Sequence, residues 1–152
     1  MTGYEMLLDV AQDKGLTVTE VPLVFYDGLI KNRKIGIRKN IETSAEKADV
    51  LAEEISHADL TVGNILDQTI CANRKQEYKA RMKSYDMRIG LDGIVKVVEM
   101  GCENAHEAAE CLGVGEKFFN EALEHYHEKY GTCVQYRDYT IIFEPTLDII
   151  KT

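Results

Sequence analysis

The stretch Leu51–His57 reads L-A-E-E-I-S-H and lies inside a segment with a clear helical pattern. Thr43 and Glu46 form a T-x-x-E capping box where that segment begins. Alanine and isoleucine then recur at helical spacing on one face as far as about Leu60. The pattern predicts one long helix with a buried stripe, and the polar residues of the quoted stretch lie outside that stripe.

Two side chains of this helix are of types that bind metal ions. Glu53 and His57 are four residues apart, so they lie about one turn apart and face the same way. The arrangement differs by one residue from H-E-x-x-H, in which two histidines bind zinc and the glutamate activates water. Here Glu53 takes the place of the first histidine, and a carboxylate shifts the preference toward harder cations. We expect Zn²⁺, or another divalent metal such as Mn²⁺, at Glu53 and His57, with Glu54 as the general base.

A third ligand has to come from another element, and Glu77 is the best candidate. It lies in a predicted helix over residues 73–89, on one face with the small residues Ala80 and Ser84, which allow two helices to approach closely. Three protein ligands would leave one position for water, as in catalytic zinc sites. The alternative is an ordinary solvated helix face, with Glu53 and His57 as an ion pair and Glu77 paired with Arg81.

The remainder of the chain indicates one α+β domain spanning residues 1–152, mainly helical. The expected order is a helix, a small N-terminal sheet packed on the metal-binding helix, that helix and the next, three shorter helices and a C-terminal β-hairpin. The corresponding ranges are 4–14, 16–26, 29–38, 43–60, 73–89, 91–99, 105–112, 116–129, 132–136 and 139–143. The alternating run Lys34–Arg38 reads as an edge strand along which a substrate could lie extended, or as an ordinary edge strand protected by basic residues.

Charge and composition restrict the function classes. The 152 residues include 26 acidic and 18 basic side chains, a net charge of -8, which disfavours nonspecific nucleic-acid binding. No apolar run is long enough to span a bilayer and the N-terminus lacks a basic start, so we expect a cytoplasmic protein without a membrane partner. The four cysteines form no CxxC pair and are expected to be free thiols.

Three segments together resemble the ImmA/IrrE family of bacterial and prophage metallopeptidases. They are A-E-K-A-D-V-L-A-E-E-I-S-H at residues 45–57, T-V-G-N-I-L-D at 61–67 and N-R-K-Q-E-Y-K-A-R at 73–81. The resemblance is strongest to the branch with an E-E-x-x-H motif and extends to F-E-P at 143–145.

The resemblance implies a zincin-like fold and a zinc-dependent endopeptidase of a prophage or mobile element. Its substrate would be a helix-turn-helix repressor of the same element. By position, Glu54 would be the general base, His57 and Glu77 metal ligands, and Glu53 would stand where the family has a histidine. Asp59 would bring further negative charge near the site.

Three alternatives remain open. A peptidase-like protein could bind a repressor without cutting it, because Glu53 departs from the usual ligand. Residues 108–123 resemble a helix-turn-helix, although acidic side chains dominate the would-be reading helix. E-x-x-H pairs also end at His57, His106 and His127, as in two-metal helical bundles. His125 and His127 are expected to be exposed.

Overall fold

The computed structural model describes residues 2–60 and 70–152 and has an α+β architecture, as the sequence predicts. Its described residues form six α-helices and two three-stranded sheets. The chain divides into two compact units, Met1–Ser84 and Tyr85–Thr152, with the boundary inside one helix. The expectation of a single domain stays a prediction.

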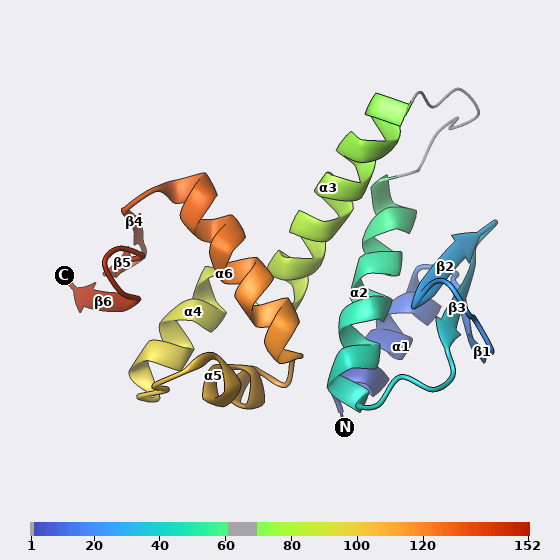
Figure 1. Cartoon of the computed structure of the whole chain (residues 1–152), viewed down its shortest axis with the longest axis horizontal. Helices are drawn as coiled ribbons and strands as arrows, with labels where there is room; N and C mark the ends of the chain where they lie inside the picture. Colours follow the sequence, from blue (N-terminus) through green and yellow to red (C-terminus); the bar gives the residue numbers. More distant parts are fainter. Residues whose placement is uncertain (1, 61–69) are drawn as a thin grey trace. The chain divides into compact units, whose positions relative to one another are not determined.

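The first unit contains the candidate site. Its elements, drawn in Figure 1, are α1 (Gly3–Asp13), β1 (Thr17–Val21), β2 (Gly28–Lys31), β3 (Lys34–Arg38), α2 (Ser44–Leu60) and most of α3 (Ile70–Arg88). Helix α2 packs against α1 and against strands β2 and β3. The sheet therefore lies beside the helix that carries Glu53 and His57, as the sequence predicts.

Helix α2 starts and is buried as the sequence predicts. The backbone N–H of Glu46 donates to Thr43 Oγ1 over 3.1 Å, which satisfies one of the free donors of the first turn. Ala48, Ala52 and Ile55 are fully buried. Burial extends beyond this stripe, because Ser56 is also inside and donates to the Ala52 carbonyl over 2.7 Å. The helix is thus fixed on several sides.

The strand order of the N-terminal sheet is β1-β3-β2, with β1 parallel and β2 antiparallel to β3. The prediction that Lys34–Arg38 is an edge strand is therefore wrong, since β3 lies in the centre. Its alternating pattern reflects Ile35 and Ile37 packing into the core. Asn32 and Arg33 both have positive φ, which closes a tight turn between β2 and β3. The edge beside α2 is β2.

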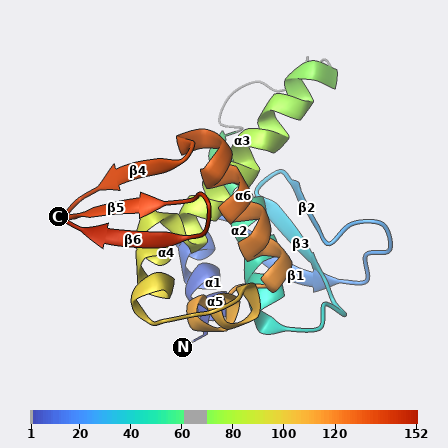
Figure 2. The same cartoon turned by 60° about the vertical axis from the view of Figure 1, so that its left-hand side comes forward.

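The second unit contains the end of α3 and six further elements. They are α4 (Gly90–Glu99), α5 (Ala105–Leu112), α6 (Glu116–Tyr130), β4 (Cys133–Tyr136), β5 (Tyr139–Ile142) and β6 (Asp148–Lys151). Strands β4 and β5 form the predicted hairpin, and β6 adds an antiparallel third strand that the sequence analysis missed, as Figure 2 shows.

The core of the second unit is formed by residues of its helices and of β5. Phe119 and Ala122 of α6 are buried, together with Tyr126 and Ile141. His125 is buried as well and lies against the rings of Tyr85 and Tyr126. Its predicted exposure is therefore wrong, because the buried face of α6 is wide enough to include it.

Membrane-spanning potential can be judged for the described helices. Within residues 2–60 and 70–152, no helix combines the length and the apolar character that crossing a bilayer requires.

Candidate metal site

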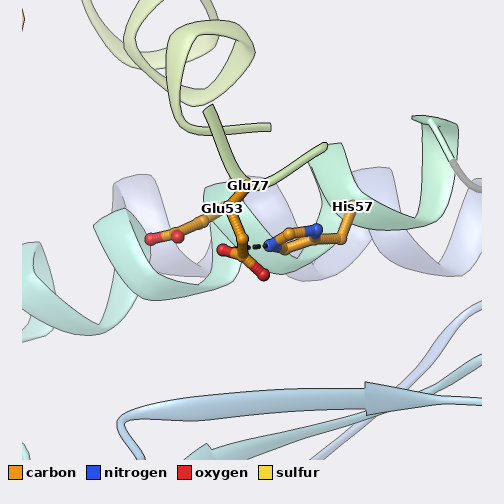
Figure 3. Close-up of side chains that lie close together, drawn as sticks. All are labelled: Glu53, His57 and Glu77. Atoms are coloured by element: carbon orange, nitrogen blue, oxygen red, sulfur yellow. Dashed lines mark ion pairs between the residues drawn. The ribbon is translucent and has the colours of Figure 1, made fainter. Parts of the chain in front are cut away.

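At the candidate site, a side chain of α2 contacts a side chain of α3. His57 Nε2 lies 3.3 Å from Glu77 Oε2, and Figure 3 shows the two side chains meeting from separate helices. His57 is mostly buried, with 13% of its side chain exposed, whereas 59% of the Glu77 side chain is exposed. The expected pairing of α2 with Glu77 is present, and it leaves one side of the pair open to solvent.

Glu53 completes the group. Glu53, His57 and Glu77 each offer one ligand atom, and these atoms all lie within 4.8 Å of one another. In Figure 3 the Glu53 carboxylate extends along α2, on the other side of the Glu77 carboxylate from His57. In a tetrahedral zinc site with bonds near 2.0–2.1 Å, neighbouring ligand atoms are roughly 3.3 Å apart. The His57–Glu77 pair already has that separation, and the Glu53 ligand atom lies within 4.8 Å of both.

Glu54 lies beside the group and is largely buried, with 8% of the residue exposed. Burial raises the pKa of Glu54 to about 8, and the negative charges of Glu53 and Glu77 act in the same direction. With no cation bound, the carboxyl group is therefore mostly protonated at neutral pH, which an exposed glutamate is not. A cation held by the neighbouring side chains would favour the carboxylate form, which is the form that accepts a proton.

Gly28 allows strand β2 to approach α2 closely at this point. A Cβ atom at position 28 would lie 2.7 Å from Val50 Cγ1, 3.0 Å from Glu54 Cγ and 3.1 Å from Glu54 Oε1. Any side chain there would push against the β-branched Val50 and against Glu54. Glycine thus brings the main chain of the edge strand next to the buried carboxyl group.

A pocket of about 470 Å³ joins these parts. Its walls come from the start of β2 and the loop before it on one side, and from α2 and α3 on the other. The lining residues are Tyr26, Asp27, Gly28, Leu29, Ile30, Val50, Glu53, Glu54, His57 and Glu77. The three candidate ligands and Glu54 therefore open into the same cavity as the edge of β2.

Asp59 does not add free negative charge to the site. Lys14 Nζ and Lys83 Nζ each lie 3.1 Å from one of its carboxylate oxygens. Partial burial by itself would raise the pKa of Asp59, but the hydrogen bonds from Lys83 and Lys14 outweigh it and lower the pKa. These ion pairs join the end of α1 to α2 and α3, so Asp59 helps to place α3 where Glu77 reaches His57.

His106 also lies near two glutamates, but these do not meet at one point. His106 Nε2 lies 3.2 Å from Glu110, and its Nδ1 lies 3.6 Å from Glu116. The two carboxylates therefore contact different ring nitrogens and cannot share one ion with the imidazole. In the part of the chain that the structure describes, Glu53, His57 and Glu77 form the only group of three or more His, Cys, Asp or Glu residues whose ligand atoms all lie within 4.8 Å of one another.

Sequence reasoning missed the contribution of the loop and strand before α2. The predicted strands cover residues 16–26 and 29–38, so Tyr26 falls inside a strand and Gly28 outside any element. A glycine followed by the apolar pair Leu29 and Ile30 is compatible with a close backbone approach. Nothing in the local sequence says which helix that backbone approaches.

Comparisons with known proteins leave the family open. No protein-family model matches the chain, and a search of curated proteins finds no significant similarity.

Proposed function

We propose that this protein is a metal-dependent endopeptidase of ImmA/IrrE type with a zincin-like active site. The single observation that carries the proposal is the convergence of Glu53, His57 and Glu77 beside the buried Glu54 in one pocket. The donor set of one imidazole and two carboxylates suits Zn²⁺, and its negative charge also suits a harder cation such as Mn²⁺.

Glu54 would handle the proton in peptide hydrolysis. Its carboxylate takes a proton from the attacking water and delivers it to the nitrogen of the leaving amine. A metal ion held by Glu53, His57 and Glu77 would supply Lewis acidity for the peptide carbonyl and make the water more acidic. The position of Glu54 supports the proton-transfer role, because its buried side chain lines the same pocket as the three candidate ligands.

Strand β2 would hold the substrate. Its outer edge is unpaired among the described strands, and its first residues line the pocket. An extended polypeptide can pair with such an edge through main-chain hydrogen bonds. This assignment replaces β3, whose two edges are both paired.

Metal content is the first test. Purified protein incubated with one equivalent of Zn²⁺ or Mn²⁺ and desalted should retain about one ion per chain by elemental analysis. His57→Ala and Glu77→Ala should lose it, and Glu53→Gln should bind more weakly. The matched control is His106→Ala. It removes an exposed histidine whose two ring nitrogens each lie near a different glutamate. Retention of the ion in both His57→Ala and Glu77→Ala would eliminate this site.

Substitution of the general base tests the chemistry separately from binding. Glu54→Gln keeps the size of the side chain but cannot accept the proton, so we expect metal retention and a fall in cleavage rate of at least about 100-fold. Undiminished cleavage by this variant would refute the role of Glu54.

The proposed substrate is a protein, a helix-turn-helix repressor encoded near this chain on the same mobile element. The test is incubation with the product of the neighbouring repressor gene, with and without a chelator, followed by mass spectrometry of fragments. Cleavage that stops with chelator and returns with Zn²⁺ is expected. A repressor that stays intact under all three conditions would contradict the substrate assignment.

A second candidate is a protein that binds the repressor without cutting it. One observation favours it. In Figure 3 the Glu53 carboxylate extends along α2 away from His57, so it does not yet point at a common centre with the other two side chains. This candidate predicts a stable complex with the intact repressor and no metal-dependent fragments. The same incubation, followed by gel filtration, separates it from the peptidase.

A further inference from the structure

An exposed apolar loop lies immediately before strand β2. Val24, Phe25 and Tyr26 are 81%, 90% and 61% exposed, and they are three consecutive large hydrophobic residues. Leu29 of β2 is also exposed. Single exposed hydrophobic residues are ordinary, but a contiguous group usually marks a binding surface. Because Tyr26 and Leu29 line the pocket, this group is continuous with the candidate site.

The other end of β2 is basic. Lys31 ends the strand and pairs directly with Lys34 of β3 across the turn. Directly paired residues of an antiparallel sheet project to the same face, and like charges in such a pair repel. Arg33, between them, is held by the Lys14 carbonyl, to which its guanidinium donates. No described residue forms an ion pair with Lys31 or Lys34, so their charges are available to an anionic partner.

These residues make up a surface with two different ends, here called the β2 edge surface. Its members are Val24, Phe25, Tyr26, Leu29, Lys31 and Lys34. Residues of a strand rise by about 3.3 Å each, so the three steps from Gly28 to Lys31 cover about 10 Å. One extended segment of a few residues can therefore contact both ends. Leu29 and Lys31 are two apart and project to the same face, so they contact alternate side chains of that segment, which are also two residues apart.

We propose that the β2 edge surface selects extended protein segments that have large apolar side chains at one end and acidic side chains at the other. The inference rests on the proposed function for the identity of its occupant, a substrate segment paired with β2, and adds the chemistry of that segment. Charge complementarity with Lys31 and Lys34 fixes the acidic end, and Phe25 and Tyr26 fix the apolar end.

Two other occupants fit the surface less well. An apolar and basic patch can also contact an anionic membrane, but a net charge of -8 opposes that association. A second copy of the chain would bring two Lys31–Lys34 pairs together if the interface were symmetric. Neither occupant accounts for the continuity of the surface with the pocket.

The test uses fluorescein-labelled peptides and the Glu54→Gln protein, so that binding is measured without cleavage. The first peptide carries Phe and Leu in one half and two Glu in the other. A second has Lys in place of Glu, and a third has Ser in place of Phe and Leu. Each is made in both sequence orders. Fluorescence anisotropy at low salt should give the tightest binding for the first peptide, and added salt should weaken it.

Charge reversal gives the decisive comparison. Lys31→Glu with Lys34→Glu should weaken binding of the Glu peptide by about fivefold to tenfold and make the Lys peptide the preferred one. Lys117→Glu with Lys151→Glu is the control, because it changes the net charge equally in the second unit. Phe25→Ser should weaken the apolar peptides by about tenfold and leave the Ser peptide unchanged. Met6→Ser, at another exposed hydrophobic residue, should change neither.

The outcomes separate this inference from the peptidase proposal. Inverted charge preference supports the inference even if the wild-type protein cleaves none of the peptides, a result that would count against the peptidase alone. A preference that charge reversal leaves unchanged overturns the inference, while metal-dependent cleavage of the same peptides would keep the peptidase. Peptides that do not bind, together with Phe25-dependent dimers or Phe25-dependent sedimentation with anionic vesicles, would also overturn it.

Discussion

At the scale of single residues, the site depends on one carboxyl group that is buried and one glycine that makes room for it. Glu54 is inside the first unit although glutamate is rarely buried, and the loss of solvation raises its pKa. Gly28 has no side chain, and this leaves room for the Glu54 carboxyl group next to strand β2. A single substitution can therefore change either the carboxyl group or the room that it occupies.

Gly28→Ala should damage the site more than it damages the sheet. The added methyl group would lie 2.7 Å from Val50 Cγ1 and 3.0 Å from Glu54 Cγ, so the strand or the carboxyl group must move. Overpacking of this kind costs about 1–3 kcal/mol of unfolding free energy, and displacement of Glu54 should lower the cleavage rate further.

The control for Gly28→Ala is Gly36→Ala, in the same sheet. Its Cβ would crowd only Val21, at 3.0 Å, away from Glu54. Urea denaturation should therefore show a loss of stability for Gly28→Ala at least as large as that for Gly36→Ala, and the cleavage rate should fall clearly only for Gly28→Ala. Equal cleavage rates would mean that Gly28 is not needed to position the carboxyl group.

His125 should make the stability of the protein depend on pH on the acidic side of neutrality. Burial and the charge of Lys129 lower the pKa of His125, and the opposing effects of Asp86 and Glu128 are smaller. The unfolded state therefore binds more protons, and the free energy of unfolding should fall as the pH drops below about 6.5. His125→Gln should reduce this fall, as measured by urea denaturation at pH 5 and pH 7.5.

At the scale of elements, the site is made by the meeting of three of them. Helix α2 supplies Glu53, Glu54 and His57, α3 supplies Glu77, and β2 supplies the wall opposite. The ion pairs of Asp59 with Lys14 and Lys83 hold α1, α2 and α3 together near the same place. In the hairpin of β2 and β3, Lys31 and Lys34 are paired directly beside the turn, and their like charges repel.

Lys34→Glu should stabilise the β2–β3 hairpin and weaken the binding of acidic segments to the β2 edge surface. The change replaces the Lys31–Lys34 repulsion by an attraction across the strands, worth about 0.2–1 kcal/mol in unfolding free energy. Urea denaturation should show the gain, and high salt should reduce it. A loss of stability on this substitution would show that Lys34 has a structural role.

At the scale of the whole molecule, the two compact units differ in their relation to the site. Every candidate ligand and Glu54 belong to Met1–Ser84, and none belongs to Tyr85–Thr152. A ligand stabilises the states that bind it, by about 2.7 kcal/mol at a hundred times its dissociation constant. Metal binding should therefore stabilise the first unit more than the second.

Hydrogen exchange should detect that difference. Zn²⁺ should slow amide exchange in α2 of the wild-type protein and leave α6 nearly unchanged, and chelation should reverse the effect. His57→Ala should show no such response. An equal gain of protection in α2 and α6 would mean that the two units open together.

Local sequence was sufficient for most of the elements. The capping box at Thr43 and the helical spacing after it predicted α2, because a helix start and an apolar face are local properties. The β4–β5 hairpin was predicted for a similar reason. The missed strand β6 is four residues long, and its existence depends on pairing with β5, which local pattern does not encode.

That Glu53, Glu54 and His57 share one helix follows from local spacing, since a period of 3.6 residues fixes which side chains are neighbours. The contact of Glu77 with His57, the burial of Glu54 and the position of β2 at the pocket arise only when the chain folds. These three facts depend on contacts between segments far apart in the chain. Such contacts are set by packing and strand pairing, which no local spacing specifies.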